Sequence, residues 1–584
     1  MRTFSRSTAA LAVGVALAAA AALSAQDSPE SLLPPGFGQP VAPPADPAPR
    51  PQASPVPGAS TVPAPDASAS PSPSPSASAS GLVEPRTYQL PDYARRSLER
   101  VGVGDGEGFG PTAFGRADGR FLETLMRRLD APLPSRWLSI ALRRALVSTV
   151  NTPARVGGAD FAAERAWLLV RMGEAVAARA VVQGVDPDNA TPKLMQVAMQ
   201  AALATGDPAG LCPFSDRGFG ATGESGWILA RAMCFALAGE PAQAGAAIDA
   251  ARRRGIGRGI DLSLAEKVVG AGSQGRRSVT IEWPGTDRLT AWRWGLASAT
   301  GVEVPDDLYA TAGPQVRYWH ALSPIYPAPL RAPDAELAGA AGVLSNLALV
   351  DLYGEIDDGA ESVGAASGIA RDLRTAYVAP TAPERLAALK GLWGEPNAGA
   401  ARYGRLVLTA RAAARVRPGD APDDADTIVA SILTAGFDRN VQRWAGSVKR
   451  GGDAWAMLTL ADPAGRTLRY ADATDYSASD AKEALFAAAL AGLGRLSPTD
   501  VGRAADAYDI DLARRDAWTR AIDAAARADQ PATVVLLCAV GMQTGDWRGV
   551  SPAMLYRMLA ALRATGLGGY ARMMAAEAIA RLPS

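Results

Sequence analysis

The sequence contains a single histidine, His320, in a chain of 584 residues. One histidine excludes every metal site that needs two, such as the His-Glu-x-x-His zinc helix. A Ser-His-Asp triad would have to use His320, whose place in Tyr318-Trp319-His320 favours a packed or surface residue instead. The sequence also lacks a Cys-x-x-Cys pair, a phosphate loop and a Gly-x-Ser-x-Gly elbow. We therefore expect no metal, no cofactor and none of the common catalytic motifs.

Lysine is scarce, and charge of one sign is not in excess. The lysines are Lys193, Lys267, Lys390, Lys449 and Lys482. Lys and Arg together number 59, as do Asp and Glu, so the formal net charge is zero. Because phosphate backbones are bound by clustered positive charge, this balance argues against a nucleic-acid partner. Heavy use of Ala, Arg, Gly and Pro is typical of GC-rich bacterial genomes.

Long apolar runs are missing too. The run Ala9–Leu23 has 15 residues, shorter than the ~20 that a membrane-spanning helix needs. Two arginines precede it and small residues follow it, so residues 1–25 are expected to be a signal peptide cleaved near Ser24 or Ala25. Gln26 stands where a lipoprotein requires cysteine. These features predict a soluble periplasmic protein without a lipid anchor or a membrane span in the mature chain; the alternative is an uncleaved Ala-rich anchor.

A linker follows the signal region. Residues 26–86 are dominated by Pro, Ala and Ser, with a near-repeat of Pro-Ser and Ala-Ser over 71–80. A segment with so little to bury does not offset its ordering entropy, so we expect a disordered, semi-rigid spacer. It either holds the folded part away from a surface or is a passive leader.

Three turn signals organise the region after the linker. Gly173, Gly206 and Gly239 lie 33 residues apart, twice running. Gly206 suits the left-handed residue after a helix, Asp207 can cap the next helix, and Pro208 fits its first turn. A fixed period in the thirties is typical of stacked helix–turn–helix units.

The rest of the chain is also expected to be helical, with the turn idiom returning near the end. Thr544–Gly549 echoes Thr205–Gly210. We therefore expect an all-α fold, an α-solenoid with an N-terminal helical-repeat region over 87–275, an irregular helical middle over 276–475 and a C-terminal helical-repeat region over 476–584. Two individual helices that this pattern predicts are Asp92–Val101 and Asp334–Tyr353, whereas Thr427–Leu433 is left open between strand and helix.

Residues 160–255 resemble the tetratricopeptide family. Val185-Asp186-Pro187-Asp188-Asn189-Ala190 is similar to that family's junction between repeats, and Ala175, Ala209 and Ala242 sit where its second helix carries a small residue. The family's Trp-Leu-Gly-Tyr pattern is missing from the first helix. The resemblance implies a helical superhelix that binds partner proteins, here envelope proteins of unknown identity, and no catalysis.

A second sequence pattern indicates a different class of protein, an enzyme. Leu194-Met195-Gln196 is similar to the Gly-Leu-Met-Gln of lytic transglycosylases, but Lys193 replaces the glycine and no Glu-Ser pair lies at the expected distance upstream. The alternative to a binding scaffold is thus a cell-envelope enzyme that acts on glycan, such as peptidoglycan, with carboxylates in the middle region.

Candidate site residues are few. Cys212 and Cys234 lie in adjacent helical arms, so they either form a disulfide in an oxidising compartment or remain buried thiols; Cys538 is expected in the core. The candidate binding surface combines a basic cluster with two tryptophans from the aromatic-rich stretch 283–326. Its members are Arg252, Arg253, Arg254, Arg258, Trp292 and Trp319. The plainer interpretations are a solvated helix end for the arginines and core packing for the tryptophans.

Overall fold

The computed structural model describes residues 91–104, 109–273, 279–359 and 364–582. The expected signal peptide, with Ser24 and Ala25, and the expected linker lie outside these residues. The described residues divide into two units, residues 91–95 and those from Arg96 onward. The first includes the 3₁₀ turn η1 (Asp92–Ala94). All elements below belong to the other unit, which is described by itself.

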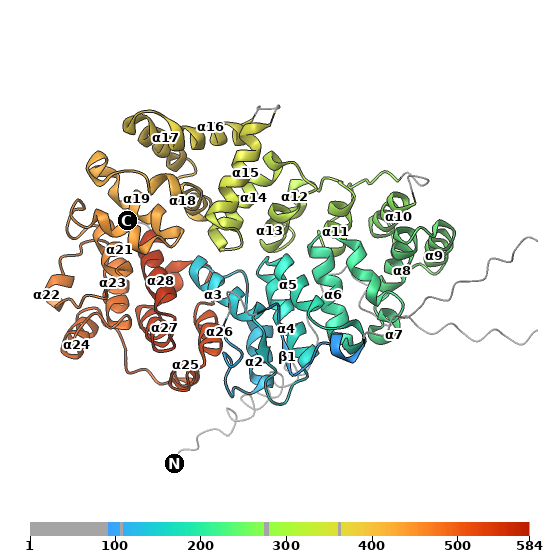
Figure 1. Cartoon of the computed structure of the whole chain (residues 1–584), viewed down its shortest axis with the longest axis horizontal. Helices are drawn as coiled ribbons and strands as arrows, with labels where there is room; N and C mark the ends of the chain where they lie inside the picture. The colour runs from blue at the N-terminus through green and yellow to red at the C-terminus, as the bar shows by residue number, and fades with distance from the viewer. Residues whose placement is uncertain (1–90, 105–108, 274–278, 360–363, 583–584) are drawn as a thin grey trace, which may run out of the picture. The chain divides into compact units, whose positions relative to one another are not determined.

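The described residues are mostly helical, which confirms the all-α class (Figure 1). The strands among them form a short antiparallel pair, β1 (Arg100–Val101) with β2 (Val150–Asn151). Within the described ranges, no helix is both long enough and apolar enough to cross a membrane.

The expected helix Asp92–Val101 is wrong. Its last two residues form β1, in which Val101 pairs with Val150. The Val101 carbonyl accepts a hydrogen bond at 2.8 Å from the guanidinium of Arg165, which is fully buried. A buried guanidinium must find such partners because leaving its N–H groups unpaired is costly. Bonds to distant residues therefore override the local helical spacing.

Three groups of helices follow one another along the chain. The first group consists of α2 (Gly119–Arg128), α3 (Arg136–Val147), α4 (Gly158–Arg171), α5 (Ala175–Gln183), η2 (Pro187–Asn189), α6 (Pro192–Ala204), η3 (Pro208–Phe214), α7 (Gly218–Thr222), α8 (Gly226–Leu237), α9 (Pro241–Arg253) and α10 (Ile260–Gly272). The second consists of α11 (Ala291–Ala299), α12 (Asp306–Tyr309), α13 (Gln315–Leu322), α14 (Ala328–Ala341), α15 (Asn346–Asp358), α16 (Ala365–Val378), α17 (Ala382–Gly394), α18 (Gly399–Ala413), η4 (Pro418–Asp420), η5 (Pro422–Asp424) and α19 (Ala425–Thr434). The third consists of α20 (Asp438–Val441), η6 (Gln442–Trp444), α21 (Asp453–Ala461), α22 (Tyr470–Ala473), α23 (Asp480–Gly492), α24 (Pro498–Ala507), α25 (Ala517–Arg527), α26 (Pro531–Gly541), η7 (Trp547–Gly549), α27 (Pro552–Ala564) and α28 (Gly568–Arg581).

The expected turn glycines separate helices that pack on each other. Gly173 lies between α4 and α5, Gly206 between α6 and η3, and Gly239 between α8 and α9. Their φ angles are 85°, 61° and 80°, in the left-handed region that favours glycine. A Cβ on Gly206 would lie 2.8 Å from Ser298 Oγ of α11, so this turn also contacts a second helix closely.

The expected helix Asp334–Tyr353 is two helices, α14 and α15. The break falls at Gly342, whose φ is 94°. A Cβ there would lie 2.8 Å from the Arg136 carbonyl oxygen, so the turn is held against α3. Ser345 then accepts a hydrogen bond from Ala348 N at 3.1 Å and caps α15.

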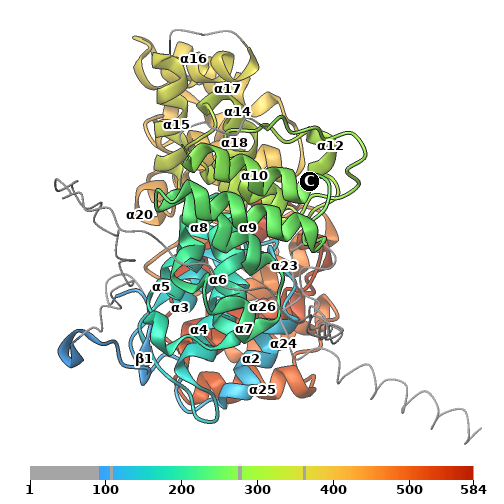
Figure 2. The ribbon, with the colours of Figure 1, turned by 90° about the vertical axis from the view of Figure 1, so that its right-hand side faces the viewer.

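Helices from both ends of the unit pack together. Helices α14, α18, α19, α21 and α28 contact one another in series, and α28 and α26 contact α3 (Figure 1). Figure 2 shows α8, α9 and α10 side by side, in agreement with their contacts. Contacts of α10 with α11, and of α21 with α23, run across the boundaries expected near 275 and 475, which stay predictions.

Candidate functional site

The two tryptophans of the expected binding surface are buried. Trp292 is 0% exposed and Trp319 is 1% exposed. Trp292 donates from Nε1 to the Asp261 carbonyl at 3.1 Å, and Trp319 packs edge-on against Trp294 with ring centroids 5.5 Å apart. Both therefore stabilise the core between helices and offer no surface to a partner, which corrects the expectation that they belong to an exposed surface.

The arginines of that expected surface are exposed. Arg252 and Arg253 form the last turn of α9, and Arg254 and Arg258 follow it. Arg252 pairs with Asp249 at 3.5 Å and also contacts Glu266, so part of its charge is already matched. Their position at the C-terminal end of a helix complements the helix dipole, as a solvated helix end would.

His320 is packed between aromatic rings. Its ring centroid lies 5.8 Å from that of Tyr309 and 4.7 Å from that of Tyr326. Its Nδ1 lies 2.8 Å from Asp334 Oδ2, and Arg317 pairs with the other oxygen of that carboxylate at 3.1 Å. This arrangement orients the imidazole within the helical packing.

A disulfide joins Cys212 of η3 to Cys234 of α8. The two residues are separated by 22 positions, and the bond connects the end of one hairpin to the first helix of the next. Cys538 is a free thiol and is fully buried, and burial raises the pKa of this thiol.

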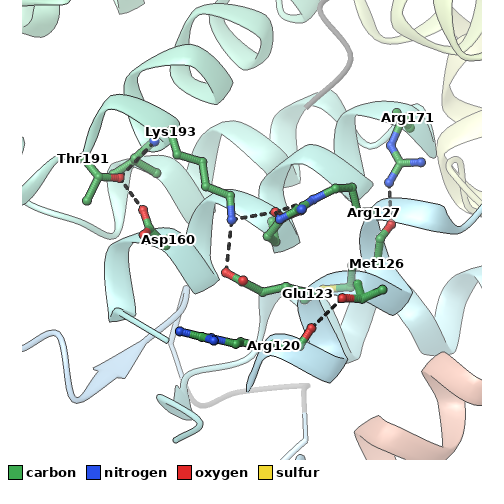
Figure 3. A network of polar contacts seen from close by, with 11 residues as sticks. Arg120, Glu123, Met126, Arg127, Asp160, Arg171, Thr191 and Lys193 are labelled. Atoms are coloured by element: carbon green, nitrogen blue, oxygen red, sulfur yellow. Dashed lines mark hydrogen bonds and ion pairs between the residues drawn. The ribbon is translucent and has the colours of Figure 1, made fainter. Parts of the chain in front are cut away.

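A buried ion cluster links α2, α4 and α6 (Figure 3). Lys193 Nζ lies 3.1 Å from Glu123 Oε1 and 2.6 Å from Glu164 Oε1. Arg127 contacts the same oxygen of Glu164 at 2.5 Å, and the Glu164 side chain is fully buried. A buried carboxylate between two cations is satisfied electrostatically, so Lys193 has a structural partner where the transglycosylase pattern has glycine.

A recurring link connects the starts of helices that pack on each other. In each case a carboxylate in the first turn of one helix accepts a hydrogen bond from the cap or first turn of a later helix, which follows directly for α10 and after an intervening helix for α4, α19 and α21. The pairs are Asp160 of α4 with Thr191 Oγ1 before α6 (2.6 Å; Figure 3), Asp261 of α10 with Arg293 Nε of α11 (2.8 Å), Asp426 of α19 with Ala454 N of α21 (2.7 Å), and Asp453 of α21 with Lys482 Nζ of α23 (2.6 Å). Carboxylates at helix N-termini also complement the dipole, so each link stabilises two helix starts at once.

The last two of these links line a cavity of about 900 Å³. This volume is in the range of small-molecule sites, roughly 300–1,000 Å³. Its wall includes the first turns of α18 and α19, residues of α21, α23 and α28, and the η7 turn. The buried apolar residues of its lining are Tyr403, Leu406, Ala430, Met457, Trp547 and Leu582.

Charged residues surround this apolar lining. The cations are Arg402, Lys482, Arg548 and Arg581, and the carboxylates are Asp426, Asp453 and Asp546. Lys482 is 1% exposed and pairs with Asp453, whose other oxygen accepts from Tyr476 Oη at 2.7 Å. No sequence pattern predicts this cavity, since its wall combines residues as distant as Pro134 and Leu582.

Two buried carboxyl groups have strongly shifted pKa values. Burial is the main cause for both, and it raises the pKa of Glu174 and that of Glu224 from 4.5 to about 7. Arg143 pairs with Glu174 at 2.9 Å and opposes the shift. For Glu224 the opposing contact is a neutral one, a 3.1 Å hydrogen bond from Gln196 Nε2. Neither residue lines the 900 Å³ cavity.

Within the ranges that the structure describes, no group of three or more His, Cys, Asp or Glu side chains is arranged to hold a metal ion. No protein-family model, curated protein or solved structure matches this chain. Evidence about function therefore comes from the residues of this chain and their geometry.

Proposed function

We propose that this protein is a helical-repeat scaffold of the bacterial periplasm, an α-solenoid that binds an envelope protein without catalysing a reaction. The signal-like N-terminus and the Pro/Ala/Ser-rich linker support the location. The hairpins at Gly173, Gly206 and Gly239 support the repeat.

The observation that carries the proposal is the recurring first-turn carboxylate. Asp160, Asp261, Asp426 and Asp453 each bond to the start of a later helix that packs against their own. Repeating the same link keeps helix starts in step along the chain, as stacked units of a solenoid require. Such stacks present extended surfaces, which suit recognition of a protein partner.

The proposal is tested by disturbing one turn between units. Gly206→Val places a β-branched residue at φ 61° and its Cβ 2.8 Å from Ser298 Oγ. We expect about 1–2 kcal/mol of backbone strain and about 1–3 kcal/mol more from the overpacked contact with α11. The measurement is photo-crosslinking to envelope proteins in cells, quantified for each variant at equal protein level, with urea unfolding of the purified variants.

Gly239→Val is the matched control. Its φ is 80°, so the backbone strain is similar, but a Cβ there meets nothing within 4 Å. We expect Gly239→Val to keep its crosslinked partner and Gly206→Val to lose it while retaining helical circular dichroism. Equal crosslinking by both variants and the wild type would count against a scaffold whose geometry matters.

One observation favours the enzymatic alternative, a glycan-acting protein. Asp426 and Asp453 lie in the middle region and share one cavity of about 900 Å³. The deciding experiment is incubation of purified peptidoglycan with the wild type, Asp426→Asn and Asp453→Asn. The scaffold proposal predicts no soluble glycan fragments from any of them. The enzymatic alternative would be established if the wild type released soluble glycan fragments and either substitution abolished that release without changing the thermal melt.

A further inference from the structure

The charges of the cavity are largely neutralised from within the protein. Lys482 pairs with Asp453, Arg548 pairs with Asp546, and Arg581 pairs with Glu577 at 3.1 Å. These pairs leave little net charge to attract a simple anion or cation.

Two charged residues of the cavity differ from the rest. Within the described residues, Arg402 has no carboxylate partner and donates only to the Trp393 carbonyl, at 3.0 Å. Asp426 has no cationic partner there, and its Oδ1 accepts from Ala454 N at 2.7 Å. The cavity thus holds one positive and one negative group that no opposite charge among the described residues matches.

The surroundings of Arg402 favour a carboxylate. Arg402 lies in the first turn of α18, a 15-residue helix whose N-cap, Ala398, provides no side-chain hydrogen bond. Asn397 and the N-cap Ala398 line the cavity together with Gly399, Ala400 and Arg402 of the first turn of α18. Free backbone N–H groups, the positive end of the helix dipole and a guanidinium fork all suit a planar carboxylate.

We propose that this cavity binds a short peptide with free ends. Its terminal carboxylate lies at Arg402 and the start of α18, and its terminal ammonium lies at Asp426. Its apolar side chains contact the lining formed by Leu406, Met457 and Trp547. A polyanion is disfavoured because Asp426, Asp453 and Asp546 face the same space. This inference does not depend on the scaffold proposal, because it concerns a small ligand and not a protein partner.

The test uses the full mature chain and the tripeptide Ala-Leu-Ala in four forms: free, N-acetylated, C-amidated and blocked at both ends. Isothermal titration calorimetry gives each affinity. We expect the free peptide to bind most tightly, and blocking either end to weaken binding roughly tenfold or more, as loss of a charge-assisted hydrogen bond does.

Two variants assign the ends. Arg402→Gln should weaken binding of the free peptide roughly tenfold and leave binding of the C-amide unchanged, because the amide no longer uses the arginine. Asp426→Asn retains an oxygen for Ala454 N and should weaken the free peptide but not the N-acetylated one. Arg402→Lys keeps the positive charge and should lose less affinity than Arg402→Gln, which separates binding from damage to the fold.

The controls are Arg417→Gln and Asp423→Asn, two exposed residues outside the cavity wall. They should bind all four peptides as the wild type does. The proposal is overturned if the four peptides bind equally, if none binds at millimolar concentration, or if the cavity variants behave like these controls. Peptidoglycan assays and envelope crosslinking are separate readouts, so the scaffold proposal can fail while this one holds, and the reverse.

Discussion

Glu224 is the residue at which burial and charge conflict most clearly. It is 4% exposed, and the side chain that donates a hydrogen bond to its Oε1 is Gln196, a neutral amide. Its Oε2 is buried without a hydrogen-bond partner. An ionised carboxylate with so little compensation is unfavourable, which is why burial raises the pKa of Glu224 to about 7.

This shift predicts a pH dependence of stability. Between pH 4.5 and about 7, folded Glu224 retains a proton that the unfolded chain has released, so stability falls as pH rises through that window. Glu224→Gln removes the charge and keeps an oxygen for Gln196. We expect the variant to be about 1–3 kcal/mol more stable than the wild type at pH 8.5 and to lose this advantage at pH 4. Urea unfolding at both pH values measures the difference.

The control for this experiment is Glu384→Gln, at an exposed glutamate that caps α17. Its effect on stability should be small and alike at both pH values. A Glu224→Gln variant that changes stability by the same amount at pH 4 and pH 8.5 would show that the carboxyl group titrates normally in the folded protein.

At the residue scale, local conformation could be predicted from the sequence but burial could not. The positive φ of Gly206 follows from its place between helical patterns, a local property. Trp292 and Trp319 were left between a binding surface and core packing, and both are in the core, because burial depends on helices that pack from elsewhere in the chain. Whether Arg402 and Asp426 have a partner of opposite charge likewise depends on residues far away in the sequence, so the sequence could not predict it.

At the scale of elements, helix identity was predicted better than helix limits. Thr427–Leu433 could not be assigned from its β-branched residues alone, and it lies within α19. Asp334–Tyr353 has continuous helical spacing, but Gly342 ends α14 where the chain meets α3. A tertiary contact therefore sets the end of α14, which the helical spacing of the sequence does not reveal.

The disulfide between η3 and α8 gives a prediction at this scale. Closing a loop of 22 residues stabilises the folded state by about 3 kcal/mol in the chain-entropy picture. Replacing Cys212 and Cys234 together with serine should therefore speed hydrogen exchange in α8 and η3 and lower the urea midpoint. Mass spectrometry of a non-reduced digest should show the linked peptides in the wild type.

Two observations check that prediction. A reductant should destabilise the wild type but not the double-serine variant, since Cys538 is buried and is not part of a disulfide. Two alkylatable thiols at Cys212 and Cys234 in freshly isolated protein would mean that the bond does not form in the cell.

At the scale of the whole folded unit, the joining of its two ends had no signal in the sequence. Glu577 of α28 is 2% exposed, and its carboxylate accepts hydrogen bonds from Ser135 Oγ at 2.6 Å and from Arg136 N at 2.8 Å. Trp137 N donates a further hydrogen bond to this carboxylate at 3.3 Å. One carboxylate therefore accepts from two backbone N–H groups at the start of α3 that have no partner within the helix. The partners are separated by more than 400 positions, and no spacing rule connects residues so far apart.

Removing this carboxylate should loosen the ends of the unit before the rest. Glu577→Ala leaves the Arg136 N–H and the Ser135 hydroxyl buried without their acceptor, which we expect to cost about 3–5 kcal/mol. Hydrogen exchange should accelerate in α3, α26 and α28, because α3 contacts both of the other helices, and remain unchanged in α16 and α17. Glu384→Ala, which removes an exposed capping glutamate, should instead accelerate exchange only near the start of α17. Uniform acceleration in Glu577→Ala would mean that the unit unfolds as a single block, and no acceleration at all would mean that other contacts hold its ends together.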